Sequence, residues 1–277
     1  MSPAAEARYA RAMHELHGIA FSHYVEKARW VLDRYHVPYV DKRYLPFLHI
    51  PAMHRLHGGR AGKVDKASTR YSTPALKTPS GQVLADSAAI VRYVSDTFAA
   101  PGDELYFDPE AATLEQRFHD ALGPHTRRAA YGFLFERPEL IRRVVEKNVS
   151  PAQARLFRLV RPAAQLGLRR LLHIDDAGVT RSIEKVRGEF ADVGARLADG
   201  RPFLLGDRFS AADLAFAALS APALLPQGYS AWLPSPEELP DRGRALTYEL
   251  RATPAGAFAL RLYRDERGRV VSPKIPA

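Results

Sequence analysis

The chain has 277 residues, enough for two domains, and carries a formal net charge of +9 at pH 7. It contains no cysteine, which excludes disulfides, thiolate metal sites and cysteine nucleophiles. The N-terminal residues lack the apolar core of a signal peptide, and the longest apolar run, 214–226, is too short to cross a bilayer. These features predict a cytoplasmic protein that does not bind membranes.

The excess positive charge comes mostly from arginine, and the arginines are spread along the chain. Some form pairs, as at 127–128, 142–143 and 169–170, but none builds a basic block with interleaved aromatic residues. A protein that binds nucleic acid usually concentrates its charge in one patch or stripe. We therefore interpret the arginines as a solvated surface and expect no nucleic-acid partner.

The first hundred residues predict a small α/β domain. Strand-like segments at 13–19 and 39–44 flank a helical pattern over 24–36, and a long basic loop follows over 45–71, with room for a short helix near 50–56. Two further strands are expected at 75–78 and 82–84, and then a helix over 87–98. The order strand–helix–strand, then strand–strand–helix, describes a small α/β domain of about 85 residues, a length that folds alone.

Beyond a linker at 99–103, strand patterns nearly disappear. Helices are expected at 109–131, 138–148, 151–173, about 180–199, 214–225, 236–252 and 254–265. Ser210 and Asp213 have the spacing of a capping box, so we assign Asp213 to folding rather than catalysis. The helix after them is apolar on every side and should be the buried centre of a helical bundle.

Two short motifs in the first domain predict a ligand site. Thr73 and Pro74 precede a strand, where a proline is tolerated and where a cis bond is a candidate. Asp86 and Ser87 open a helix, whose N-terminal N–H groups favour an anion. Taken alone, Asp86 and Ser87 are also explained as a plain N-cap. Together the motifs favour an extended, peptide-like ligand that carries a carboxylate.

These motifs, in this order, resemble the glutathione S-transferase family. The resemblance rests on residues 73–76 and 86–90 and on the segment 206–213 before the apolar helix. It implies a thioredoxin-like α/β N-terminal domain at 11–99 and an all-α C-terminal helical domain at 109–277. It also implies glutathione as cosubstrate, a small electrophilic and mostly apolar acceptor, and a homodimer. Thr73, Pro74, Asp86 and Ser87 would then hold glutathione.

The same resemblance places Ser22 at the catalytic position, where its hydroxyl would hold the glutathione thiolate. Tyr24 is the alternative hydroxyl, although packing inside the helix explains it as well. His23 is a candidate general base, but an exposed loop histidine is the more ordinary interpretation. The glycine carboxylate of glutathione needs a cation. The candidates are Lys63, Lys66 and Arg70.

A second hypothesis is a glutathione-transferase-like protein that has no catalytic activity and binds another macromolecule. The basic charge and the long loop at 45–71 fit that hypothesis. A third is an enzyme that uses a different small thiol. His49, His54 and His57 lie in the loop, but without cysteine or a suitably spaced carboxylate we expect no metal site.

Overall fold

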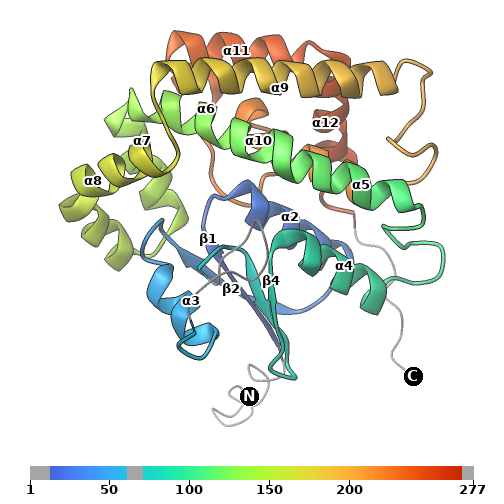
Figure 1. The fold of residues 1–277 in the computed structure, drawn as a ribbon, viewed down its shortest axis with the longest axis horizontal. Coiled ribbons are helices and arrows are strands. Elements are labelled where there is room, and N and C mark those ends of the chain that lie inside the picture. The colour runs from blue at the N-terminus through green and yellow to red at the C-terminus, as the bar shows by residue number, and fades with distance from the viewer. Residues whose placement is uncertain (1–12, 61–70, 270–277) are drawn as a thin grey trace.

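Four strands form one mixed sheet in the order β2–β1–β3–β4 (Figure 1). The computed structural model describes residues 13–60 and 71–269. Strand β1 pairs in parallel with β2 and antiparallel with β3, and β4 closes a hairpin with β3. The strands are β1 (His14–Ile19), β2 (Tyr39–Tyr44), β3 (Ala75–Lys77) and β4 (Val83–Ala85).

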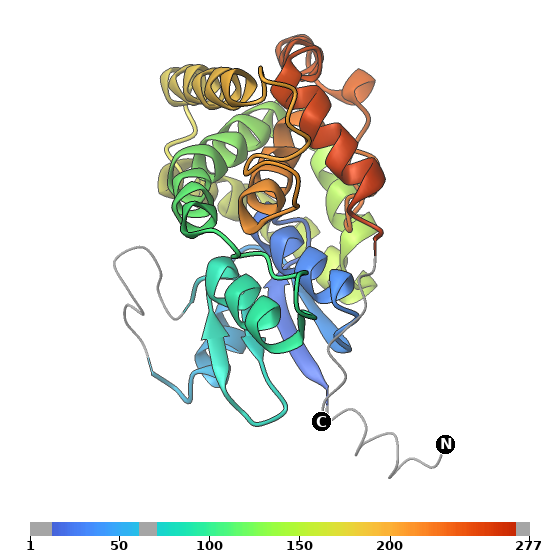
Figure 2. The same ribbon diagram turned by 90° about the vertical axis from the view of Figure 1, so that its right-hand side faces the viewer.

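Three helices complete the sheet domain, close to the positions that the sequence predicts. They are α2 (His23–Arg34), α3 (Ile50–Leu56) and α4 (Ser87–Phe98). Helices α2 and α4 lie between the sheet and the helices of the second domain (Figure 2). The ligand motifs at the starts of α2 and α4 therefore sit in the sheet domain, on the side that carries these two helices.

The rest of the described chain is helical, which confirms the predicted fold class of a thioredoxin-like α/β domain followed by an all-α domain. The helices are α5 (Pro109–Arg117), α6 (Gly123–Phe135), α7 (Pro138–Asn148), α8 (Pro151–Leu171), α9 (Asp176–Arg196), α10 (Ala211–Leu224), α11 (Asp241–Arg251) and α12 (Pro254–Asp265).

Two predicted helices are interrupted, each beside a proline. The helix expected over 109–131 contains a π-helical segment, Phe118–Leu122, and restarts at Gly123. Pro124 has no N–H to donate to a carbonyl of the preceding turn, so the α-helical ladder cannot continue through it. The helix expected over 236–252 is a 3₁₀ turn, Pro236–Glu238, followed by α11, because Pro240 holds the preceding residue extended.

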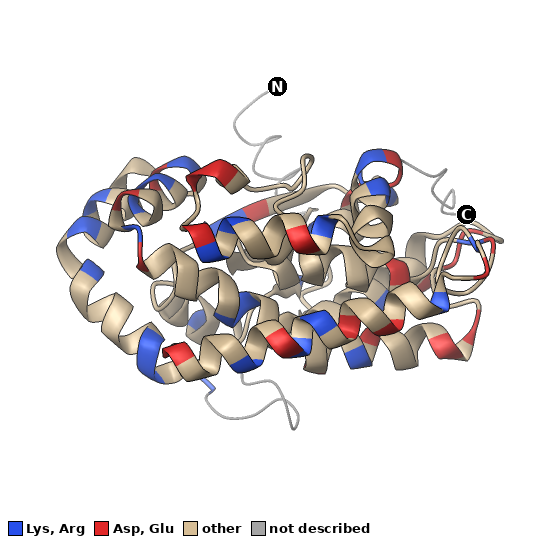
Figure 3. Cartoon of the chain, turned by 90° about the horizontal axis from the view of Figure 1, so that it is seen from above, with Lys and Arg blue, Asp and Glu red and all other residues tan. Residues whose placement is uncertain are grey.

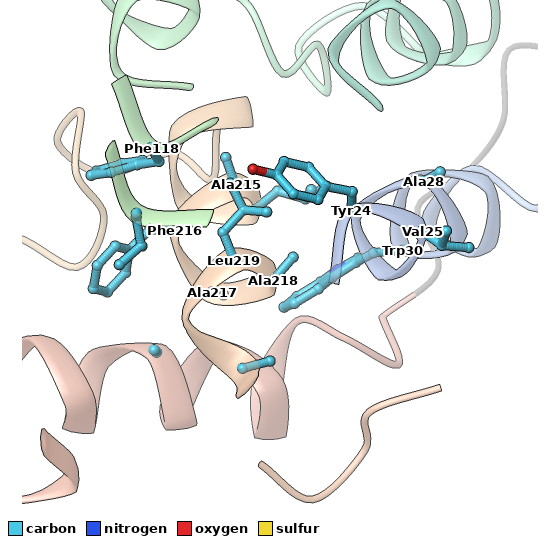
Figure 4. Close-up of a cluster of buried hydrophobic side chains, with 14 of the residues drawn as sticks. Tyr24, Val25, Ala28, Trp30, Phe118, Ala215, Phe216, Ala217, Ala218 and Leu219 are labelled. Carbon is cyan, nitrogen blue, oxygen red and sulfur yellow. The ribbon is translucent and has the colours of Figure 1, made fainter. Parts of the chain in front are cut away.

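Helix α10 is the buried centre of the helical domain, as the sequence predicts. The ring of Phe216 lies 5.2 Å from that of Phe118 and 5.4 Å from that of Phe190. Figure 4 shows α10 between Phe118 on one side and the α2 side chains Tyr24 and Trp30 on the other. The core is thus continuous between the two domains.

Asp213 holds the start of α10 and is fully buried. Its carboxylate accepts hydrogen bonds from the backbone N–H of Leu204 at 2.8 Å and from the N–H and Oγ of Ser210 at 2.8 Å and 2.6 Å. The capping box is present in the structure. This agrees with the assignment of Asp213 to folding.

Buried ion pairs join α2 to the helical domain. Lys27 Nζ lies 2.6 Å from Glu115 Oε1, and Arg34 Nη1 lies 2.9 Å from Glu266 Oε2. Arg267 Nε lies 2.7 Å from Glu26 Oε1. A buried pair that loses one partner leaves an uncompensated charge, which typically destabilises a protein by about 3–5 kcal/mol. These pairs, which involve both the first turns and the last residue of α2, therefore fix where the helical domain sits on this helix.

Candidate functional site

A cavity of about 400 Å³ lies where the two domains meet. Ser22 and Thr73 are among the residues that line it from the sheet domain. The helical domain contributes a mostly apolar wall, which includes Ala130, Tyr131, Leu134, Leu168, Leu172, Pro222 and Leu246. Concave, mostly apolar sites with a few polar groups are typical of small-molecule binding. The cavity is therefore the candidate site.

Ser22 occupies the N-cap position of α2, but its side chain makes no capping hydrogen bond. Its backbone is held on both sides: its N–H donates to the carbonyl of Ile19 at 3.0 Å, and its carbonyl accepts from the N–H of Glu26 at 2.9 Å. Serine caps usually accept a hydrogen bond from the first turn, as Ser150 does at the start of α8. The hydroxyl of Ser22 is thus left for another partner at the cavity wall.

The Thr73–Pro74 peptide bond is cis, which confirms the prediction for this position. Strand pairing sets Ala75 opposite His17, so the bond lies near the end of β1 that leads into Ser22. Thr73 lines the cavity, and neither of its backbone groups is hydrogen-bonded to another residue in the described ranges. An open backbone edge therefore faces the same region as the Ser22 hydroxyl.

Asp86 is tied to this edge through Pro74, because its backbone N–H donates to the Pro74 carbonyl at 3.1 Å. As the N-cap of α4 it accepts from the N–H of Ala88 at 2.6 Å. Its φ of 86° is in the left-handed region, which costs a residue with a side chain about 1–3 kcal/mol. Its other oxygen lies 3.5 Å from His119 Nε2. Capping accounts for one oxygen of Asp86 and leaves its strained backbone unexplained.

Ser87 differs from an ordinary cap residue. Its side chain is fully buried, and its Oγ has no hydrogen-bond partner within the described part of the chain. A buried hydroxyl without a partner costs about 1–3 kcal/mol. Neither Ser87 nor Asp86 lines the cavity; Asp86 is hydrogen-bonded to Pro74, which follows the lining residue Thr73. An unsatisfied hydroxyl at a helix N-terminus is suited to an anion.

His23 is not the exposed loop histidine that the sequence favours. It is 3% exposed, and its Nε2 donates to the carbonyl of Gly123 at 2.9 Å. Burial, reinforced by the positive charge of Arg127, lowers the pKa of His23 to about 3. The imidazole is therefore neutral at neutral pH and a weak base. The hypothesis that His23 acts as a general base is not supported by this environment.

Tyr24 is packed between the domains, as expected for a helix residue. It is 8% exposed, and its hydroxyl donates to the carbonyl of His119 at 2.9 Å. That carbonyl is in the π-helical segment, where Pro124 has no N–H to offer it. Burial also raises the pKa of the Tyr24 phenol. Because its hydroxyl already donates its proton to the His119 carbonyl, Tyr24 is a poorer candidate than Ser22 for holding a thiolate.

Sequence reasoning missed the contribution of α6 to the cavity. Arg127, Tyr131 and Leu134 recur at helical spacing and line the wall, but the sequence showed Arg127 only as one half of a charged pair. Lys63, Lys66 and Arg70, the candidate cations for the glycine carboxylate, lie outside the described residues. Within the ranges 13–60 and 71–269, no three potential metal ligands gather at one place.

Residues 16–102 match the family model described as the glutathione S-transferase N-terminal domain. The N-terminal domain of this chain belongs to the glutathione S-transferase family. The match spans the sheet domain, and therefore Ser22, Thr73, Pro74, Asp86 and Ser87. No curated protein sequence matches the chain significantly.

Solved glutathione S-transferases share the fold over nearly the whole chain. One from Ceriporiopsis subvermispora, in complex with glutathione, is 21% identical, with 94% of this chain and 98% of that chain covered and a TM-score of 0.57. A transferase from Phanerochaete chrysosporium is 19% identical, with 94% and 99% covered and a TM-score of 0.59. One from Methylobacillus flagellatus, with glutathione bound, is 17% identical, with 93% and 100% covered and a TM-score of 0.55. At these identities the likeness shows a common fold.

Proposed function

We propose that this protein binds glutathione and conjugates its thiolate to a small, electrophilic and mostly apolar acceptor. The observation that carries the proposal is the cavity, which combines Ser22 and the open backbone edge at Thr73 with an apolar wall from the helical domain. One side suits a peptide-like thiol and the other an apolar electrophile. The glutathione bound in similar structures supports the choice of thiol.

Glutathione would lie along the edge from Asp86 to Ser22. The γ-glutamyl carboxylate would accept from Ser87 Oγ and from the N–H groups that open α4, and the amine would meet the carboxylate of Asp86. The backbone of the cysteinyl residue would pair with Thr73 as an added strand does. Of these groups, Ser87 Oγ has no hydrogen-bond partner among the described residues, and the backbone groups of Thr73 are not hydrogen-bonded to any of them.

Ser22 would hold the sulfur as a thiolate. A free thiol has a pKa of about 8.5, and only its anion is a good nucleophile. A hydroxyl donor and the N-terminus of α2 both favour the anion, so the thiol would give up its proton to solvent near neutral pH. The sulfur lone pair then forms a bond to the electrophilic carbon. The electron pair of the bond that breaks at this carbon leaves with a departing group, or moves to the adjacent atom, which takes a proton from solvent. The protein supplies position and electrostatic stabilisation and forms no covalent bond with either substrate.

Calorimetric titration with reduced glutathione tests the proposal. Free ligand at 100 times its dissociation constant should stabilise the protein by about 2.7 kcal/mol, which a thermal-shift assay also detects. Cysteinylglycine, which lacks the γ-glutamyl group, is the matched control ligand and should bind far more weakly. Ser87→Ala should weaken the binding of glutathione but leave the binding of cysteinylglycine unchanged. Absence of any heat or thermal shift with millimolar glutathione would overturn the proposal.

One observation favours the second hypothesis, a protein that binds another macromolecule. Helix α8 exposes Leu156, Leu159, Val160, Leu166 and Leu171, with Leu159 at 81%. Arg155, Arg158, Arg161 and Arg170 share this helix, and none forms an ion pair with a carboxylate in the part of the chain that the structure describes. Lys and Arg residues are frequent at the end of the molecule that contains α7 and α8 (Figure 3). An acidic macromolecular partner would complement this face.

Substitutions on the α8 surface and at the glutathione site distinguish the two hypotheses. Leu159→Asp should abolish macromolecular binding and leave glutathione binding unchanged, whereas Ser87→Ala should weaken glutathione binding and leave macromolecular binding unchanged. We also propose that the protein is a homodimer and is cytoplasmic, as the resemblance to the family implies. None of the described helices is long and apolar enough to cross a membrane.

A further inference from the structure

Arg127 is the single formally charged residue among the described residues that line the cavity. It extends from α6 one turn after Gly123, whose carbonyl holds His23. Its guanidinium carbon lies 6.0 Å from the centre of the Tyr24 ring. Arg127 therefore brings a positive charge to the wall of the cavity that adjoins Ser22.

No carboxylate pairs with the charge of Arg127 within the residues that the structure describes. No carboxylate lies within ion-pair distance of it, and its buried Nε has no hydrogen-bond acceptor. The neighbouring Arg128 is satisfied, because its Nε donates to the carbonyl of Leu172 at 2.6 Å and its Nη1 to Ser182 Oγ at 2.9 Å. The contrast shows that the fold provides acceptors for one arginine of the pair and not for the other.

The charge acts on the groups beside it. Burial lowers the pKa of the His23 imidazole, and the positive charge of Arg127 lowers it further. The same charge partly opposes the rise that burial gives to the pKa values of the Tyr24 and Tyr131 phenols. Residues on two elements, α2 and α6, thus experience the positive charge of Arg127, although at Tyr24 the carboxylates of Asp86 and Asp120 oppose it.

A charge beside an apolar wall is costly unless it finds a counterion. The described side chains that line the cavity offer none, since they include no Asp or Glu and are mostly aliphatic or aromatic. A guanidinium presents a planar fork of donors that matches a carboxylate or sulfonate. The ligand that satisfies this site would place an acid group on Arg127 and an apolar body against Leu134, Leu168 and Leu172.

We propose that the cavity selects apolar ligands that carry an acid group, and that Arg127 binds that group. The proposal rests on the proposed function only in naming these ligands as the acceptors of conjugation, because their binding does not require glutathione. It defines the acceptor class as hydrophobic organic anions with an electrophilic centre, and it makes Arg127 the residue that determines this specificity.

The test compares two fluorescent probes that share one skeleton: 8-anilinonaphthalene-1-sulfonate, which carries the acid group, and N-phenyl-1-naphthylamine, which does not. Affinities are measured without glutathione. The wild type should bind the sulfonate at least about tenfold more tightly, a preference within reach of one charge-assisted contact. Arg127→Met should bind both probes alike, and Arg127→Lys should keep part of the preference.

Three controls keep the result interpretable. Unchanged binding of the neutral probe to Arg127→Met shows that the cavity has survived the substitution. Arg142→Met removes an exposed arginine of α7 that does not line the cavity, and it should leave the preference intact. A wild type without preference, or an Arg127→Met variant that retains it, overturns the proposal even if glutathione binds. A preference that depends on Arg127 without glutathione binding sustains the anion site and refutes the proposed transferase.

Discussion

The buried His23 should make the protein less stable in mild acid by a calculable amount. Its pKa is about 3 in the folded state, against about 6.5 when it is exposed. The stability that neutral His23 contributes is complete above the exposed value and is lost as the pH falls towards the folded value. At about pH 5 the unfolded chain is protonated and the folded chain is not, which favours unfolding by about 1.36 × 1.5, or roughly 2 kcal/mol.

His23→Gln provides the comparison, because glutamine does not titrate and retains an N–H that can donate to the Gly123 carbonyl. Urea unfolding at about pH 7.5 and about pH 5 gives the free energy for both proteins. Other histidines with lowered pKa values, such as His14 and His119, contribute equally to both. The wild type should lose about 2 kcal/mol more than the variant between the two pH values. An equal loss in both proteins would refute the assignment of His23 as buried and neutral.

The remaining predictions concern the caps and the two hydroxyls near the cavity. Ser22→Ala should leave the melting temperature nearly unchanged, since Ser22 makes no capping bond, yet slow conjugation by about a hundredfold; a large drop in melting temperature would restore the capping role. Asp213→Asn should lower the free energy of unfolding, measured with urea, by about 3 kcal/mol, because an amide has only one oxygen and leaves a buried N–H of Leu204 or Ser210 without an acceptor. An unchanged free energy of unfolding would contradict this. Tyr24→Phe should keep turnover but lower stability by about 1 kcal/mol, and a collapse of turnover would identify Tyr24 as the catalytic hydroxyl.

The sequence predicted the sheet domain well because its signals are local. Helical spacing, Pro74 before β3 and the polar pair that opens α4 each act within a few residues, and the elements appear where they were expected. The capping box that begins α10 is equally local. The two predicted helices that are interrupted, at 109–131 and 236–252, differ for a related reason: Pro124 and Pro240 lie inside patterns whose apolar spacing continues past them.

The candidate site was predictable only on the side of the sheet domain. Ser22, Thr73 and Asp86 belong to short motifs, whereas the opposite wall is formed by helices that meet only after folding. The burial of His23 has the same origin, since its acceptor, Gly123, is 100 residues away along the chain. That no described carboxylate pairs with the charge of Arg127 could not be foreseen either, because a sequence does not show which arginine of a pair finds acceptors.

The pKa of the thiol of bound glutathione tests the central claim most directly. It is measured from the ultraviolet absorbance of the thiolate as the pH of the protein–glutathione complex is varied, in the wild type and in Ser22→Ala. We expect the wild type to lower the thiol pKa well below its free value of about 8.5, and the variant to raise it again by about one unit or more. Identical values in the two proteins, or a wild-type value equal to that of free glutathione, would contradict the role of Ser22 in holding the thiolate.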